Sequence, residues 1–377
     1  MLIIDAHLDL AWNALQWNRD ITKSVYTIRT QESDLTEPGR GQNTVAFPEM
    51  RQGRVAVAFA TLLARSTGHP DPHIDYGRPA QAYGIAQGQL AYYHALAEAG
   101  QIRLISDVTM LNQHIAEWEQ WETDLESGLN ESHLSTSSSA VSGYTSPPLG
   151  LIISMESADP IIEPVQLEQW WQAGLRIIGP AHYGLGRYAG GTATEGGLTD
   201  LGQALLPRMA ELGMILDMTH FSDQAFWQAL NLFDGSVLAS HNNCRALVPH
   251  QRQFNDDQLK AIIERDGVIG TVFDAWMLKT GWVINHTTNE IVSLNDVVNQ
   301  IDYVCQLSGN SQHSAIGSDL DGGFGKDQSP HDLDTIADLQ KLVGMLRERG
   351  YVETDIANIM HGNWLRLLRR SWAGTLV

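Results

Sequence analysis

The feature of this sequence that most constrains its fold is a regular alternation of short apolar runs with longer helical patterns. Eight runs have the length and β-branched content of buried strands: Leu2–Asp5, Val55–Leu62, Leu149–Met155, Leu175–Pro180, Met214–Met218, Ser236–Ala239, Gly267–Phe273 and Ser314–Gly317. The helical patterns cover Ala80–Ala99, Leu201–Leu212, Asp223–Leu232, Asp256–Arg265, Leu294–Leu307, Asp332–Arg349 and Trp364–Trp372. This alternation is typical of a parallel sheet in an α/β fold. Eight strands favour a (β/α)8 TIM barrel, and an open doubly wound sheet is the alternative.

Length and loop composition indicate how the chain is divided. With 377 residues and no internal repeat or long linker, we expect residues 1–377 to form a single barrel domain with loop insertions. Residues 127–148 are rich in Ser, Thr, Gly and Pro, which predicts an inserted loop before the third strand. Residues 23–50 and 64–80 are also expected to be long surface loops, of the kind that can cover a substrate.

Charge and targeting signals exclude several classes of function. The net charge is −20, and nucleic acids and anionic membranes both require a cationic surface, so we expect neither as a partner. Cys244 and Cys305 cannot build a disulfide framework, which favours a reducing compartment. The chain shows no signal peptide, membrane span or lipid-anchor signal. These observations predict a soluble cytoplasmic protein.

The chemistry of the sequence is concentrated where the apolar runs end. Six of the eight runs end in His, Asp or Glu, which places the following residues at strand ends: His7, Asp9, Glu156, His182, His220, His241, Asp319 and Asp321. In a (β/α)8 barrel those ends meet at one mouth. His7 and Asp9 lie two positions apart on a strand and therefore point to one face. Imidazole and carboxylate ligands suit zinc and its first-row neighbours. Carboxylates at this density would repel one another without a cation, so the sequence predicts a metal site.

The motifs, taken in order, resemble the membrane (renal) dipeptidase family of zinc peptidases, which have amidohydrolase-type barrels. The resemblance extends from residue 3 to Gly362-Asn363 near the end of the chain. It rests on Asp5-Ala-His7-Leu-Asp9, Glu156, His182, His220, Ser240-His241, Arg252 and Gly317-Ser-Asp319-Leu-Asp321-Gly. It implies a barrel of the metal-dependent hydrolase type and the activity of a metallopeptidase on dipeptides.

The resemblance also implies a binuclear site with two zinc ions per chain. His7 and Asp9 match the ligands of the first zinc, and His220 and His241 match those of the second. Glu156 matches the carboxylate that bridges both ions, with a hydroxide as the other bridge. That hydroxide would attack the peptide carbonyl of the substrate.

The remaining implied roles concern the substrate and the transferred proton. His182 matches the histidine that contacts the substrate and polarises the scissile carbonyl. Arg252 matches the arginine that binds the terminal carboxylate, which would favour dipeptides over proteins. Asp319 matches the aspartate that contacts the substrate beside the hydroxide, takes its proton and passes it to the leaving amine. Whether a D-residue is accepted at the C-terminal position stays open.

Two other functions are compatible with parts of the pattern. The first is another amidohydrolase-type barrel that acts on a cyclic amide, a lactone or a phosphotriester. Such enzymes commonly carry His-x-His on the first strand, whereas this chain has His7-x-Asp9. The second is a catalytically silent, peptide-binding barrel, which would be marked by the loss of a ligand, and none is lost. The expected partners are a dipeptide substrate and, because dimers are the commonest oligomers, a second copy of the chain.

Some residues near the motifs have competing interpretations. Arg252 could instead form a surface salt bridge, and Asp321 is expected to cap or hydrogen-bond a loop rather than take part in catalysis. Asp5 could orient a ligand histidine or bond to the backbone at the barrel base. Trp12 is expected near the pocket, and His250 either near it or behind a ligand. The other histidines, including His313, are predicted to lie at the surface.

Overall fold

The computed structural model describes residues 1–71, 73–127 and 146–373. Nine strands lie within these residues, and every recorded pairing between them is parallel. They are β1 (Ile3–Leu8), β2 (Val55–Leu63), β3 (Ile102–Leu104), β4 (Leu149–Glu156), β5 (Leu175–Gly179), β6 (Ile215–Asp217), β7 (Val237–Leu238), β8 (Ile269–Thr271) and β9 (Ser314–Ile316). All eight predicted strands form, and β3 is additional.

The strands follow one another around a curled sheet. Hydrogen bonding runs in the order β1-β2-β4-β5-β6-β7, and β8 pairs with β9. One edge of β4 is shared, because β3 pairs with its first residues and β5 with its last ones. A bridge joins Ala239 to Ile269, and the amide of Asp319 donates to the His7 carbonyl at 3.2 Å. The end of β9 therefore lies beside the end of β1. The fold is α/β, with a curled parallel sheet.

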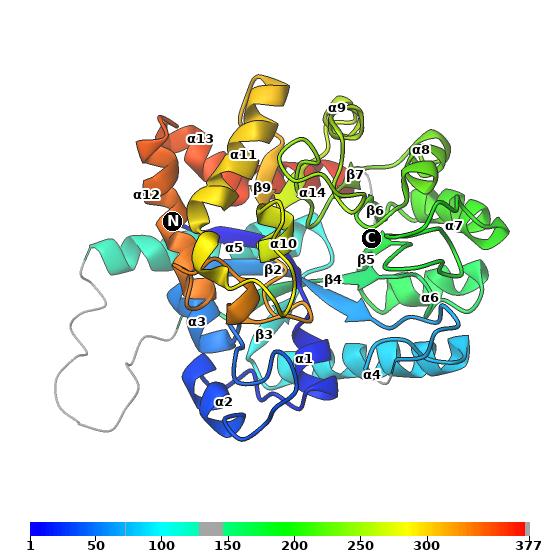
Figure 1. Cartoon of the computed structure of the whole chain (residues 1–377), viewed down its shortest axis with the longest axis horizontal. Coiled ribbons are helices and arrows are strands. Elements are labelled where there is room, and N and C mark those ends of the chain that lie inside the picture. Colours follow the sequence, from blue (N-terminus) through cyan, green and yellow to red (C-terminus); the bar gives the residue numbers. More distant parts are fainter. Residues whose placement is uncertain (72, 128–145, 374–377) are drawn as a thin grey trace.

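Helices surround this sheet, as Figure 1 shows. They are α1 (Leu10–Gln16), α2 (Val25–Gln31), α3 (Phe47–Gln52), α4 (Pro79–Glu98), α5 (Val108–Glu126), α6 (Leu167–Gln172), α7 (Asp200–Glu211), α8 (Asp223–Leu232), α9 (Asp256–Glu264), α10 (Ala275–Leu278), α11 (Leu294–Ser308), α12 (Lys341–Glu348), α13 (Glu353–Ala357) and α14 (Asn363–Trp372). Because helices cover the sheet, the strands are buried along almost their whole length and are apolar rather than alternating. One continuous apolar core extends from Leu2 to Trp372.

Several sequence expectations about loops and helices were wrong. Residues 23–50 contain α2 and the start of α3, because Ser24 caps α2 and Val25 and Ile28 bury their side chains. The predicted helix Asp332–Arg349 is instead a 3-10 turn over Ile336–Gln340 followed by α12. That turn is fixed by tertiary contacts, since the amide of Ile336 donates to the Thr44 carbonyl at 2.9 Å.

Three further expectations concern the loop 127–148, the exposure of His313 and the absence of a membrane-spanning helix. Of the predicted loop 127–148, residues 128–145 lie outside the described residues. His313, expected at the surface, is buried, and its Nδ1 lies 2.8 Å from the Gly267 carbonyl. No helix among the described residues has the length and apolar character needed to cross a membrane.

Candidate active site

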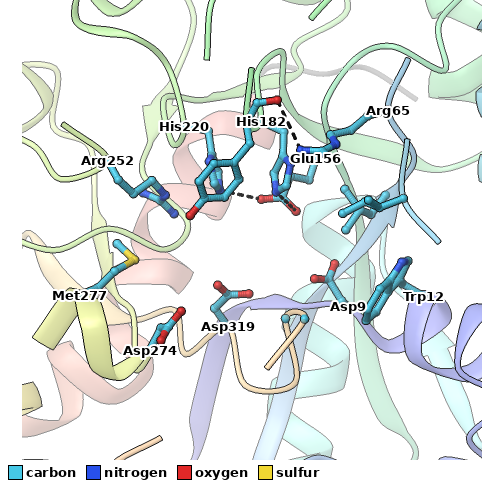
Figure 2. Close-up of a pocket in the computed structure, with 15 residues that line it drawn as sticks. Asp9, Trp12, Arg65, Glu156, His182, His220, Arg252, Asp274, Met277 and Asp319 are labelled. Carbon is cyan, nitrogen blue, oxygen red and sulfur yellow. Dashed lines mark hydrogen bonds and ion pairs between the residues drawn. The ribbon is translucent and has the colours of Figure 1, made fainter. Parts of the chain in front are cut away.

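The predicted site residues converge at the carboxyl ends of the strands. His7 lies in β1, Glu156 ends β4, and Arg252 lies in the segment between β7 and α9, whereas the others follow strands directly or within a few residues. They surround a cavity of about 360 Å³. Figure 2 shows its walls, which are formed by Asp9, Trp12, Leu63, Arg65, Ile74, Glu156, His182, Tyr183, His220, Arg252, Asp274, Met277, Asp319, Gly322 and Gly323. His7 and His241 lie buried behind these residues.

Three possible ligand atoms form a compact triangle. His220 Nε2 lies 3.1 Å from His241 Nε2 and 3.1 Å from Glu156 Oε1, and His241 Nε2 lies 3.4 Å from the same oxygen. Two ligands held at about 2.0–2.1 Å in tetrahedral geometry around one zinc ion would be about 3.3 Å apart. The spacing of this triangle therefore fits the binding of a single metal ion.

A second group of ligand atoms surrounds His7. Its Nε2 lies 3.6 Å from Glu156 Oε2, 3.6 Å from Asp319 Oδ1 and 3.9 Å from Asp9 Oδ1. This nitrogen is buried and has no hydrogen-bond partner in the part of the chain that the structure describes. Although burial opposes a charge on His7, the carboxylates of Glu156, Asp319 and Asp9 raise its pKa to about 10. Positive charge is therefore stabilised at this position, as a metal site requires.

Hydrogen bonds behind two of the histidines leave their inner nitrogens free to bind a metal. Ser240 Oγ donates to Asp217 and therefore accepts from Nδ1 of His241, which lies 2.9 Å away. Thr192 Oγ1 donates to the carbonyl of His220 and therefore accepts from Nδ1 of the same residue, which lies 3.0 Å away. These partners place the protons on Nδ1 and the lone pairs on Nε2, an arrangement typical of metal-ligating histidines.

The electrostatics of the cluster keep His220, His241 and Glu156 in their metal-binding forms. Burial holds the pKa of both His220 and His241 well below the usual value, and the charge of Arg252 acts in the same direction, so both rings stay neutral. Burial opposes ionisation of Glu156, but the positive charge favoured on the neighbouring His7 holds its pKa well below the usual range. Glu156 is therefore a carboxylate, with one oxygen facing each group of ligand atoms. The residues fit a pair of metal ions that share Glu156.

The backbone is left-handed at two of the residues that enter the site. His220 has φ of 66° and Asp319 has φ of 58°. Non-glycine residues adopt this region rarely and at a cost in free energy, and such residues cluster at functional sites. Both follow the end of a strand, where a sharp change in chain direction turns the side chain toward the cavity.

Arg252 is a buried cation without an anionic partner. Its side chain is only 2% exposed. Nη2 donates to the His241 carbonyl at 2.9 Å and Nη1 to Asn242 Oδ1 at 3.2 Å, while Nε has no partner. Among the described residues no carboxylate lies within 4.0 Å of it. The alternative of a surface salt bridge is therefore wrong, and the guanidinium lines the cavity ready for an anion.

The contacts of Asp321, Asp5 and Trp12 decide between the interpretations that the sequence allowed. Asp321 accepts from the amide and hydroxyl of Thr44 and the amide of Val45, which makes it a loop anchor as expected. Asp5 accepts from the backbone amides of His7 and Ser318, so the backbone interpretation holds. Trp12 lines the cavity as predicted.

His250 lies outside the cavity wall. The residue is exposed, and its Nδ1 accepts from the Arg252 amide at 3.0 Å. Its contact with the site is therefore indirect, through the backbone of Arg252.

The sequence interpretation missed two charged residues of the cavity, Arg65 and Asp274. They follow β2 and β8, the strands that correspond to the two apolar runs to which the sequence analysis assigned no strand-end residue. Asp274 directly follows the run Gly267–Phe273, and Arg65 comes three residues after Leu62. The rule that strand ends carry the chemistry, applied to all eight runs, would have found both.

Comparisons with known proteins give a consistent result. The family model described as membrane dipeptidase (peptidase family M19) matches residues 1–373. An uncharacterised protein in the pqqA 5′ region of Klebsiella pneumoniae is 32% identical over 214 residues, which cover 55% of this chain and 76% of that protein. Dipeptidase aclJ of Aspergillus oryzae is 31% identical over 220 residues, which cover 56% of this chain and 50% of that protein.

A solved structure supports the same fold. The metallo peptidase from Rhodobacter sphaeroides, liganded with a phosphinate mimic of the dipeptide L-Ala-D-Ala, superposes with a TM-score of 0.73. The match covers 99% of each chain at 21% sequence identity. At this identity the likeness shows a shared fold over the whole length.

Proposed function

Because this chain belongs to the membrane dipeptidase family, peptidase family M19, we propose that it hydrolyses the peptide bond of dipeptides by means of two bound zinc ions. The observation that carries the proposal is the pair of ligand groups that share Glu156, located beside a cavity that is also lined by the buried Arg252, which has no carboxylate partner among the described residues. A metal pair and an anion-binding arginine in one cavity suit a substrate with a peptide carbonyl and a free carboxylate.

The metal ligands follow from the two groups. His220, His241 and Glu156 would hold one ion, and His7, Asp9 and Glu156 the other. Nitrogen and oxygen donors without thiolate suit zinc. When bound, such a pair would supply a water of lowered pKa and polarise the carbonyl of the substrate.

The protein's own groups would orient the substrate and move the proton. His182 lies beside Glu156, with its Nε2 3.7 Å from Oε2, and faces the cavity. A proton on that nitrogen would donate a hydrogen bond to the carbonyl oxygen as negative charge develops there. Burial, together with Asp9 and Glu156, raises the pKa of Asp319 well above its usual value. Asp319 can therefore take a proton at its carboxylate and give it to the leaving amine.

Arg252 would set the length of the substrate. A guanidinium binds a carboxylate through two parallel hydrogen bonds. A buried guanidinium that has no anion beside it destabilises the protein. Binding of the C-terminal carboxylate at Arg252, with the scissile bond at the metal ligands of the same cavity, would limit the number of residues between the two. Dipeptides would then be favoured over longer peptides.

We also interpret the curled parallel sheet as a (β/α)8 barrel. The succession of eight strands, the bridge between Ala239 and Ile269 and the bond between the Asp319 amide and the His7 carbonyl support closure of the sheet. In such a barrel, residues at the carboxyl ends of the strands share one mouth.

A panel of L,L- and L,D-dipeptides, incubated with zinc-loaded protein, tests the proposed activity. Chelated protein and Asp319→Asn serve as controls. We expect turnover that is abolished by chelation and falls by about 100-fold or more in Asp319→Asn. Absence of turnover over the whole panel, in protein shown to contain two metal ions, would contradict the proposal and favour a cyclic amide or lactone as substrate.

A further inference from the structure

Asp274 is a buried carboxylate without a cationic partner. Its side chain is 8% exposed, and Oδ1 has no hydrogen-bond partner. It directly precedes α10. Burial raises its pKa to about 7, and the nearby Asp327 acts in the same direction, against the N–H groups of Trp276 and the charge of Arg252. Burial of such a group costs free energy unless something pairs with it.

Asp274 lies on the same side of the cavity as Arg252. Figure 2 shows Arg252, Met277 and Asp274 on one side of the cavity, opposite Arg65, Trp12 and Asp9. No ion pair within 4.0 Å joins Asp274 to any cation among the described residues. Among the described residues, one cavity wall therefore presents a cation and an acidic group, each without a partner of opposite charge, separated by an apolar side chain.

A single amino-acid residue with a free carboxylate and a cationic side chain would pair with both Arg252 and Asp274. We propose that Asp274 makes the enzyme selective for dipeptides whose C-terminal residue is basic, such as lysine, ornithine or arginine. The C-terminal carboxylate would bind Arg252, the methylene groups would pack on Met277, and the terminal cation would pair with Asp274. Methionine adapts its shape to flexible aliphatic chains, and an ammonium or guanidinium group pairs well with a desolvated carboxylate.

This inference rests on the proposed function, because Arg252 places the C-terminal residue at this end of the cavity. It goes beyond that function in naming which side chain the pocket accepts. A site that hydrogen-bonds a polar group of the correct substrate rejects analogues that lack the group, because its own buried polar atoms are then left unpaired.

The test compares substrates of matched size. Ala-Lys and Ala-norleucine differ mainly in the charged terminal group, and Ala-Glu reverses the charge. For the wild-type protein at pH 8 we expect kcat/KM for Ala-Lys to exceed that for Ala-norleucine about 10- to 100-fold. Ala-Glu should be the poorest of the three.

Variants of Asp274 test whether this residue causes the preference for a basic C-terminal residue. In Asp274→Asn the ratio between Ala-Lys and Ala-norleucine should fall to about 1, whereas Asp274→Glu, which keeps the charge, should retain part of it. Asp327→Asn removes a neighbouring carboxylate that does not line the cavity, and it should keep the ratio within about three-fold of wild type.

The possible outcomes separate the two proposals. Wild-type protein that cleaves Ala-norleucine as well as Ala-Lys would overturn the inference and leave the dipeptidase function intact. An unchanged ratio in Asp274→Asn would overturn it in the same way. If none of the three dipeptides, nor any other in the panel, is cleaved by metal-loaded protein, the proposed function itself fails.

Discussion

Arg65 Nη1 lies 3.0 Å from His182 Nδ1. A guanidinium offers only donors, so Nδ1 must accept and the ring proton must lie on Nε2, the nitrogen nearer Glu156. Burial and the charge of Arg65 lower the pKa of His182 to about 3, which keeps the ring neutral. A residue from the end of β2 thus selects which nitrogen of His182 can donate into the cavity.

Replacing Arg65 should therefore reduce kcat more than it raises KM. In Arg65→Met the alternative tautomer becomes accessible, and we expect kcat for a dipeptide to fall about 10-fold or more, because removing one donor to a developing oxyanion costs up to about 100–1,000-fold. Arg65→Lys, which also only donates, should recover part of the loss. Steady-state kinetics at equal metal content would measure this, and an unchanged kcat in Arg65→Met would show that Arg65 does not act through His182.

Arg252 should contribute binding energy only when the substrate has a free C-terminal carboxylate. For Arg252→Met we expect kcat/KM for Ala-Ala to fall by about 100-fold or more, since breaking a buried charged pair costs about 2–5 kcal/mol. For Ala-Ala amide, wild type and variant should react at similarly low rates. Equal losses for both substrates would mean that the guanidinium supports the fold of the site instead of binding the carboxylate.

Removal of metal should lower stability, because the buried ligand groups would then lose their bonds to the metal ions and the positive charge of those ions. A ligand present at about 1,000 times its Kd stabilises the folded state by about 4 kcal/mol, so chelation should lower Tm by several degrees. Glu156→Gln removes the negative charge of the carboxylate that both ligand groups share. In this variant, most of the difference in Tm between metal-loaded and chelated protein should disappear. Calorimetry with and without chelator makes the comparison, and identical Tm values for the wild-type protein would argue against bound metal.

His114 should make stability depend on pH at a place remote from the cavity. Its Nε2 donates to the Ala56 carbonyl at 2.9 Å, and Nδ1 faces Arg103 at 3.3 Å. Burial lowers its pKa from 6.5 to about 4, and Arg103 adds to the effect. Between these values the unfolded chain binds more protons, so the free energy of unfolding falls as pH drops from about 6.5 toward 4, by at most about 3 kcal/mol.

Denaturant unfolding at pH 7 and pH 5 would measure that dependence. His114→Gln should lose less stability between the two pH values than wild type, whereas His94→Gln, on the exposed side of α4, should match wild type. If His114→Gln and wild type lose equal stability, the buried ring does not titrate as described.

The parts of the structure that could be predicted are those in which local pattern and burial agree. The eight predicted strands are apolar because they are buried along almost their whole length, and the metal-ligand candidates lie at the carboxyl ends of those strands or within three residues of them. The helix α5 was missed although Leu111, Ile115 and Trp118 repeat at helical spacing after Asp107. The helical spacing of α5 is therefore visible in the sequence alone.

Other features depend on contacts between distant segments and leave no local pattern. The carboxylate of Asp321 meets Thr44 across 277 positions of sequence, and Thr192 meets His220 from a separate loop. The turn over Ile336–Gln340 is set by its contact with Thr44, and its own apolar spacing suggests a helix. Positioning groups of this kind become visible only when the fold brings their segments together.

The central claim is that two metal ions, held by His7, Asp9, Glu156, His220 and His241, make this chain a dipeptidase. Zinc titration of metal-free protein, with L-Ala-L-Ala hydrolysis measured at each step, tests it most directly. The account predicts no hydrolysis without metal, a plateau at two zinc ions per chain, and failure of Glu156→Gln to reach that plateau. Hydrolysis that does not depend on added metal, or that saturates at one ion per chain, would contradict it.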